Sequence, residues 1–189
     1  MCGRYWIAPE QDNLEYAQLV RILDQKDEQI TWPSGLIVPT LPAPAITKNG
    51  IRLIHFGMKK DFLPKILLNA RSETITEKPM FKKLFSQGQR CLLPATAFYE
   101  PSPDKRGRKF VNKDGGMLYM AGLFDQSEEQ TQFVIITRDA DEVVAPSHNR
   151  MPLLLGNEEL RKIWLGDESL ATELLGLDTV VSLLESSAV

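Results

Sequence analysis

The chain contains two long apolar runs close together, Arg90–Tyr99 (RCLLPATAFY) and Met117–Phe124 (MLYMAGLF). Both runs have the length and apolar character of buried strands. Lys109–Asn112 leads into the second run through Lys113-Asp114-Gly115-Gly116, which predicts a β-hairpin. Gln132–Thr137 is rich in β-branched residues and predicts a further strand. A sheet therefore dominates the second half of the chain.

The elements around this sheet do not alternate regularly between strand and helix. Asp12 and Glu15 have the spacing of a capping box, and an apolar stripe after them (Tyr16, Leu19, Val20, Leu23) predicts a helix over Asn13–Leu23. We also expect helices over Met80–Phe85, from Asn157 to Trp164 and over Ser169–Leu175, and strands over Ile51–Phe56 and Met151–Leu155. This order predicts one α+β domain over residues 1–189, with a strongly curved, mostly antiparallel β-sheet flanked by helices.

Prolines mark the segment between the first helix and the first strand. Pro33, Pro39, Pro42 and Pro44 fall within twelve residues. Proline lacks the backbone N–H that helices and interior strands use. We therefore expect no helix in this segment, and only an edge position for any strand formed there.

Composition limits the classes of function. The chain has 189 residues, 43% of them hydrophobic, and a net charge of −3, so it is not a generally basic nucleic-acid binder. We expect no membrane span and no secretion signal. Two cysteines do not make a disulfide framework and fit a reducing cytosol, and the spacing of His55 and His148 argues against zinc. Local basic strips remain candidates for phosphate contacts: Lys59-Lys60, Lys78 with Lys82-Lys83, and Lys105-Arg106 with Arg108-Lys109.

The first residues suggest covalent chemistry with aldehydes. The chain opens Met1-Cys2-Gly3-Arg4. Removal of Met1 would give Cys2 a free α-amine, whose ordinary pKa of about 7.7–8.0 leaves a useful neutral fraction at pH 7. A neighbouring amine and thiol condense with an aldehyde, first to an imine and then to a five-membered thiazolidine. The alternative at this position is a small buried cysteine near a chain end.

Three further segments add polar groups: Asn69–Thr74 (NARSET), Phe98–Pro101 (FYEP) and Ser147–Pro152 (SHNRMP). With the opening segment they supply a nucleophile, an amide, a carboxylate, an imidazole and arginines, which suits carbonyl chemistry beside phosphates. Each residue also has a structural interpretation. Asn69 could cap a turn, Glu100 could end an exposed strand, and His148 could be a loop histidine that bonds to backbone.

Together and in this order, the four segments resemble the SRAP family, the SOS-response-associated abasic-site-processing proteins. The similarity runs from Cys2 to at least Leu155 and includes Arg90–Pro94 and Tyr119–Leu123. Three places depart from the family pattern: Phe56–Lys60, Pro101 and Gly35–Val38. The departures leave the four chemical positions intact and affect how the chain would stack DNA bases.

The resemblance implies a barrel-like sheet, a basic groove for single-stranded DNA with abasic sites, and a crosslink from Cys2 to the open-ring aldehyde. It assigns catalytic roles to four residues: Cys2, Asn69, Glu100 and His148. It also implies that Arg4 and Arg71 contact DNA phosphates, and we expect Arg150 to be a further phosphate contact. Asn69 would hold the amine or a sugar hydroxyl. Glu100 would shuttle protons at the amine, and His148 would protonate the ring oxygen or act on the sugar later.

Two other functions stay open. Cys2, His148 and Asn69 also have the residue types of a thiol peptidase, which could act on Met1 of its own chain or on other peptides. A module that binds single-stranded DNA without covalent chemistry is the third possibility. In every case we expect a monomer without metal, cofactor or membrane partner, in a bacterial cytoplasm and at the nucleoid if DNA is the substrate.

Overall fold

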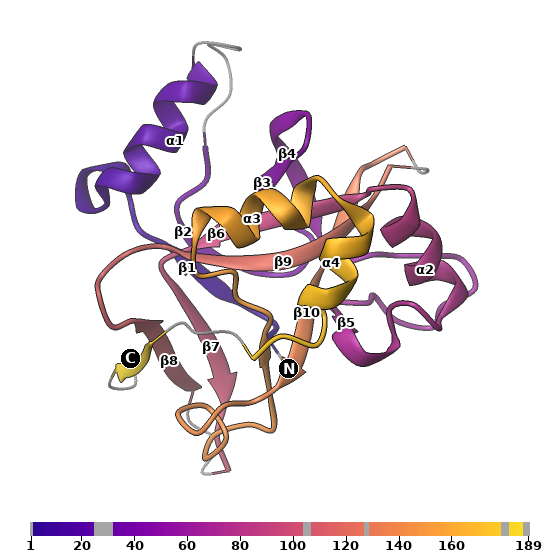
Figure 1. Ribbon diagram of the computed structural model, residues 1–189. Coiled ribbons are helices and arrows are strands. Elements are labelled where there is room, and N and C mark those ends of the chain that lie inside the picture. Colours follow the sequence, from indigo (N-terminus) through magenta and orange to yellow (C-terminus); the bar gives the residue numbers. More distant parts are fainter. Residues whose placement is uncertain (1, 25–31, 104–106, 127–128, 179–181, 187–189) are drawn as a thin grey trace.

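The computed structural model describes residues 2–24, 32–103, 107–126, 129–178 and 182–186. In this part of the chain, two β-sheets share one hydrophobic core and four α-helices lie around them (Figure 1). No helix among these residues has the length and apolar character needed to cross a membrane. The α+β fold class predicted from the sequence is confirmed.

The larger sheet closes into a ring. Its strands follow the order β11 (Arg150–Pro152), β10 (Gln132–Asp139), β4 (Gly50–Phe56), β3 (Pro42–Thr47), β6 (Arg90–Ala95) and β9 (Leu118–Asp125). Strand β9 pairs again with β10, which completes the ring. The short strand β5 (Asn69–Arg71) also pairs with β10. The pairings of β10 with β4 and β5 are parallel and the others antiparallel, so the expected barrel-like curvature is confirmed.

The smaller sheet is antiparallel throughout. Its order is β12 (Leu183–Ser186), β8 (Gly107–Asn112), β7 (Ala97–Pro101), β1 (Tyr5–Ile7) and β2 (Gly35–Ile37). The chain passes between the sheets at Thr96, whose N–H donates to the carbonyl of Trp6 at 2.8 Å and whose hydroxyl accepts from the N–H of Ala8 at 3.0 Å. The prediction of one continuous strand over Arg90–Tyr99 is therefore wrong, because the chain leaves β6 and enters β7 of the other sheet at Thr96.

The predicted hairpin between Lys109–Asn112 and Met117–Phe124 is also wrong. Strand β8 pairs with β7 and β12, whereas β9 pairs with β6 and β10, so the two segments lie in different sheets. Packing accounts for the difference. Phe110 of β8 stacks on Phe98 of β7 with ring centroids 5.2 Å apart, while Met120 of β9 lies opposite Leu93 of β6.

The proline-rich segment forms two strands, β2 and β3. The edge prediction is confirmed for β2, which is the last strand of the smaller sheet. It is wrong for β3 as a whole, which lies between β4 and β6. Its prolines Pro42 and Pro44 nevertheless have a partner strand only on the β4 side, because pairing with β6 is confined to Ile46 and Thr47.

The helices are α1 (Leu14–Asp24), α2 (Pro79–Ser86), α3 (Glu158–Leu165) and α4 (Glu168–Leu174), with 3₁₀ turns η1 (Glu10–Asp12) and η2 (Ser72–Thr74). All four helices were predicted, and the predicted cap of α3 is confirmed because Asn157 Oδ1 accepts from the N–H of Leu160 at 2.9 Å. Strands at Ile51–Phe56 and Gln132–Thr137 are confirmed as β4 and β10, while the one predicted at Met151–Leu155 is shorter, as β11.

The cap of α1 differs from the predicted capping box. Asn13 Oδ1, not Asp12, accepts from the N–H of Tyr16, at 2.9 Å. The Glu15 carboxylate instead accepts from the hydroxyl of Tyr119 at 2.6 Å and from the N–H of Met117 at 3.1 Å. Tyr16 and Val20 are buried, as the stripe predicted, and the side chain of Leu23 lies outside the described residues.

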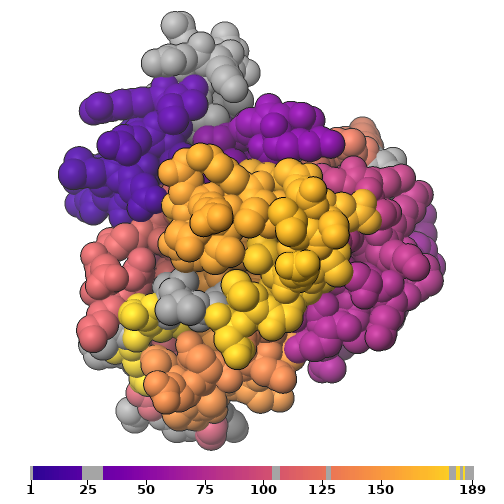
Figure 2. Space-filling model, in the orientation of Figure 1, coloured from indigo at the N-terminus to yellow at the C-terminus, as the bar shows by residue number. Residues whose placement is uncertain are grey.

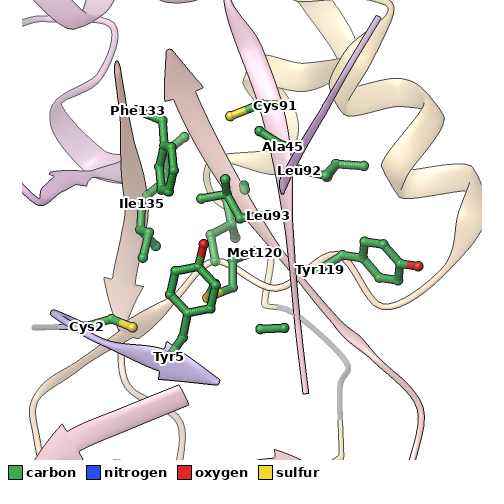
Figure 3. Close-up of a cluster of buried hydrophobic side chains, with 14 of the residues drawn as sticks. Cys2, Tyr5, Ala45, Cys91, Leu92, Leu93, Tyr119, Met120, Phe133 and Ile135 are labelled. Carbon is green, nitrogen blue, oxygen red and sulfur yellow. The ribbon is translucent and has the colours of Figure 1, made fainter. Parts of the chain in front are cut away.

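The core fills the ring and the space between the two sheets. Phe56 stacks on Phe133 across the parallel pair β4–β10 with ring centroids 5.1 Å apart, and Tyr5 meets Phe56 edge-on at 6.0 Å. Figure 3 shows Tyr5 and Cys2 in the same cluster of buried side chains as Ile135 and Met120. Helices α3 and α4 cover the centre of one face, between α1 and α2 (Figure 2). Cys2 is thus part of the hydrophobic core.

Candidate functional site

Cys2 lies directly before β1 and is held from β5. Its carbonyl accepts a hydrogen bond from Asn69 Nδ2 at 3.0 Å. Asn69 is the first residue of β5 and pairs with Ile135 of the central strand β10. The side chain of Cys2 is fully buried. The amide of Asn69 therefore fixes the backbone of Cys2.

Glu100 brings a buried carboxylate to the same place from β7. The residue is only 1% exposed, and this burial raises the pKa of its carboxyl to about 7. The charge of Glu100 also contributes to raising the pKa of the Cys2 thiol, after the larger effect of burial, so the two groups are neighbours. A carboxyl with a pKa near 7 gives and takes protons readily at neutral pH.

His148 completes the group from the loop before β11. Its Nδ1 lies 4.0 Å from Glu100 Oε2 and accepts from the backbone N–H of Arg150 at 2.9 Å. The same nitrogen lies 3.3 Å from the carbonyl oxygen of Arg150, so the contacts hold the neutral imidazole against the backbone of Arg150 in either tautomer. Burial lowers the pKa of His148 below its ordinary value, which favours this neutral form at pH 7. The ring is therefore held with Nδ1 toward Glu100 and the backbone of Arg150.

The state of the thiol distinguishes two kinds of chemistry. Burial raises the pKa of the Cys2 thiol, and Sγ lies 3.7 Å from the carbonyl oxygen of Arg4, to which it donates. A thiol peptidase needs a thiolate, usually formed with a histidine as base. Here His148 Nδ1 is directed to Glu100 and to the backbone of Arg150. This geometry gives less support to peptide cleavage than to a reaction that starts at the amine.

Two of the three predicted arginines are exposed near the site. The guanidinium of Arg4 lies 5.3 Å from the ring centroid of Tyr99, within cation–π range. It also packs against Gly107, where an added Cβ would come within 2.5 Å of Arg4 Nη2. Arg71 ends β5, two residues after Asn69. Both positions suit contacts to phosphates on either side of a bound sugar.

Arg150 differs from the expectation of a phosphate contact. The residue is only 7% exposed, and its two terminal nitrogens are engaged by protein groups. Nη1 donates to Glu73 Oε1 and Asp139 Oδ1, both at 2.6 Å, while Nη2 donates to Glu73 Oε2 at 2.9 Å and to the carbonyl of Thr137 at 2.6 Å. No terminal donor is therefore directed toward solvent, where a phosphate would lie.

A surface pocket that the sequence did not indicate opens beside the site. Its volume is about 480 Å³, and Asn69, Arg71, Lys78 and a set of apolar side chains line it: Phe62, Leu63, Leu67, Pro79, Met80 and Phe81. Phe62 is 73% exposed. A signal for this pocket was present in the sequence but was not used: Phe62 lies in a loop that carries Lys59, Lys60 and Lys65. Nucleic-acid bases stack on exposed aromatic residues, while lysines attract the phosphate backbone.

The basic strips have different surroundings. Lys78 belongs to this pocket, and Lys83 lines a neighbouring one that also includes Phe62. Lys60 instead forms an ion pair with Asp125 at 2.9 Å. Lys105 and Arg106 lie outside the described residues. Within the described part of the chain, no group of three or more His, Cys, Asp or Glu residues has a geometry that could hold a metal ion.

Comparison with known proteins supports the resemblance over almost the full length. The family model "SOS response associated peptidase (SRAP)" matches residues 1–186. The abasic site processing protein YoaM of Bacillus subtilis is 27% identical over 199 residues, which cover 93% of this chain and 83% of YoaM. The abasic site processing protein YedK of Escherichia coli is 32% identical over 54% of this chain and 48% of its own length. Mouse HMCES, also an abasic site processing protein, is 31% identical over 56% of this chain and 39% of its own.

Solved structures agree with the fold. A crystal structure of a protein from Bordetella bronchiseptica has a TM-score of 0.76 and 21% identity, covering 100% of this chain and 99% of that one. A crystal structure of a protein from Bacteroides thetaiotaomicron has a TM-score of 0.71 and 23% identity, covering 97% of this chain and 91% of that one. These similarities extend over both sheets and their helices.

Proposed function

The chain belongs to the SRAP family, and we propose that it captures abasic sites in single-stranded DNA as a covalent thiazolidine on Cys2. The observation that carries the proposal is the meeting of four groups from distant segments. Asn69 holds the Cys2 carbonyl, the buried Glu100 lies beside the thiol, and His148 lies beside Glu100. Relatives that match the chain are abasic site processing proteins, and the open ring of an abasic sugar contains the aldehyde that the proposed reaction needs.

The proposed reaction begins with the open-ring aldehyde of the abasic sugar. After removal of Met1, the neutral amine of Cys2 attacks the aldehyde carbon to form a carbinolamine. Loss of water then gives an imine. The thiol adds to the imine carbon and its proton passes to nitrogen, which closes the five-membered ring. The ring contains no imine, so it cannot lead to β-elimination and strand cleavage.

Glu100 is the group that we assign to proton transfer. Its carboxyl has a pKa of about 7, so both protonation states are populated at neutral pH. The protonated form gives the proton that the carbinolamine hydroxyl needs to leave as water. The carboxylate then takes the proton of the thiol, which burial would otherwise keep on sulfur.

His148 and the exposed arginines act on the substrate in this proposal. His148 protonates the ring oxygen as the sugar opens, or acts on the sugar later in the reaction. Arg4 and Arg71 hold flanking phosphates, and no base needs to be read, since the absent base is the recognised feature.

Intact mass after incubation with an abasic oligonucleotide tests the proposal. Protein with Met1 removed should gain the mass of the DNA less one water, and peptide mapping should place the adduct on Cys2. The same strand without an abasic site is the control and should give no adduct. Equal binding to both strands without an adduct would indicate a non-covalent module. Peptide cleavage without an adduct would indicate a peptidase.

A further inference from the structure

Arg150 connects three segments that meet at the end of β10. Its side chain binds both oxygens of Glu73 in η2, one oxygen of Asp139 and the carbonyl of Thr137 in β10. Bidentate pairing of a guanidinium with a carboxylate fixes direction as well as distance. Arg150 itself begins β11, opposite Asp139. The three segments are therefore joined through one buried side chain.

Two of the three joined segments adjoin a residue of the site. Turn η2 follows β5 directly, and β5 begins with Asn69, which holds Cys2. His148 Nδ1 lies 2.9 Å from the backbone nitrogen and 3.3 Å from the carbonyl oxygen of Arg150, so the backbone of Arg150 fixes the place of the ring. The Glu73–Arg150 pair thus links the half of the site with Cys2 to the half with His148. Two residues 77 positions apart in the sequence set the relation between these halves.

From these contacts, and on the basis of the function proposed above, we infer that Arg150 is a positioning residue. It holds His148 at a fixed place relative to Asn69 and Cys2, and it does not bind DNA phosphate. Its charge is already matched by Glu73 and Asp139. Glu100 and Arg150 are the charged side chains of the described residues that face His148.

The substitution Arg150→Gln separates positioning from phosphate binding. We expect the single-turnover crosslinking rate at saturating DNA to fall about ten- to hundredfold, the loss typical of a misplaced reacting group. The dissociation constant for single-stranded DNA should stay within about twofold of wild type. The slope of log K against log salt should also be unchanged, whereas loss of one phosphate contact would reduce it by about 0.7.

Glu73→Gln is a second variant, in case Arg150→Gln folds poorly. The two interpretations predict opposite results for it. A positioning role predicts a slower crosslinking rate, while a phosphate contact predicts tighter DNA binding because Arg150 is released from its carboxylate. Glu77→Gln is the matched control, since it removes an exposed carboxylate four residues away and should leave the rate unchanged.

A nitrogen NMR spectrum of the histidine rings gives a readout that needs no DNA. The chain has two histidines, so His55→Gln identifies the signals of His148. We expect the ring signals of His148 to shift in Arg150→Gln and Glu73→Gln, because the ring loses its fixed surroundings, and to stay unchanged in Glu77→Gln. The inference is overturned if both variants keep the wild-type rate and the wild-type ring signals, or if Arg150→Gln weakens binding and reduces the salt slope. A wild-type protein without any adduct would instead refute the proposed function.

Discussion

At the scale of single residues, the amine and the thiol of Cys2 have separate roles. Cys2→Ala keeps the amine and removes the sulfur, so the imine should form but never close to a thiazolidine. We expect no stable adduct on a denaturing gel, and an adduct that appears only when borohydride reduces the imine during the reaction. A full yield of stable adduct in Cys2→Ala would contradict the mechanism.

Glu100 predicts a pH dependence of stability. Burial raises the pKa of its carboxyl from 4.5 to about 7, so the folded state holds this proton more tightly than the unfolded state. The stabilisation is complete below pH 4.5 and is lost as the pH rises through 7, by about 3 kcal/mol in all. Urea unfolding of wild type and Glu100→Gln at pH 5 and pH 8 measures this effect. Glu100→Gln should lack this decline, and an equal decline in both proteins would contradict the assignment.

The sequence indicated the four site residues because their chemistry is visible in local motifs. It did not indicate the partner of Arg150. Glu73 lies inside the quoted motif Asn69–Thr74, yet nothing in one sequence shows that two residues 77 positions apart form an ion pair. The sequence analysis therefore expected Arg150 to be exposed and to contact phosphate. Whether Arg150 is exposed depends on the pairing of β10 with β5 and β11, which the sequence does not show.

At the scale of elements, the cap of α1 gives a clear test. Asn13→Ala removes the side-chain oxygen that accepts from the N–H of Tyr16 and should lower the free energy of unfolding by about 1 kcal/mol. Asp12→Ala, which removes the residue expected from the sequence, should change it by less than about 0.5 kcal/mol. Denaturant unfolding of both variants decides between them. A larger loss of unfolding free energy in Asp12→Ala than in Asn13→Ala would instead support Asp12 as the cap.

Helices were easier to predict than strand partners. The periodicity and end signals of α1–α4 are local, and all four were found. Strand pairing is not local. The apolar run Arg90–Tyr99 gave no sign that Thr96 turns the chain from one sheet into the other, because the turn depends on hydrogen bonds to Trp6 and Ala8. The place of β3 between two strands likewise depends on its pairing with β6 at Ile46 and Thr47.

At the scale of the whole molecule, the pocket beside Asn69 extends the site along a bound strand. Phe62 is 73% exposed and has Arg71 and Lys78 on the same pocket wall. Phe62→Ala should weaken binding of single-stranded DNA by about 1–3 kcal/mol, the value typical of one base–aromatic stack, with little effect on stability. Fluorescence anisotropy measures this loss. The exposed apolar variant Leu14→Ala on α1 is the control, and an equal loss in both would exclude stacking on Phe62.

The order of elements predicted the curvature of the sheet, whereas its barrel-like closure was expected only from the family resemblance. Irregular alternation of helices and strands predicted a bent, mostly antiparallel sheet. Ring closure requires that β10 pair with β9 on one side and with β4 and β5 on the other. Two of these pairings are parallel, and they join segments separated by more than sixty residues. No local pattern specifies such contacts.

The central place of β10 has a consequence for hydrogen exchange. Phe133–Ile136 is fully buried and is bounded by β9, β4 and β5, so its amides reach water only when the ring itself opens. These amides should be the last to take up deuterium from heavy water. Their exchange rates would then report the free energy of complete unfolding under native conditions, without any denaturant.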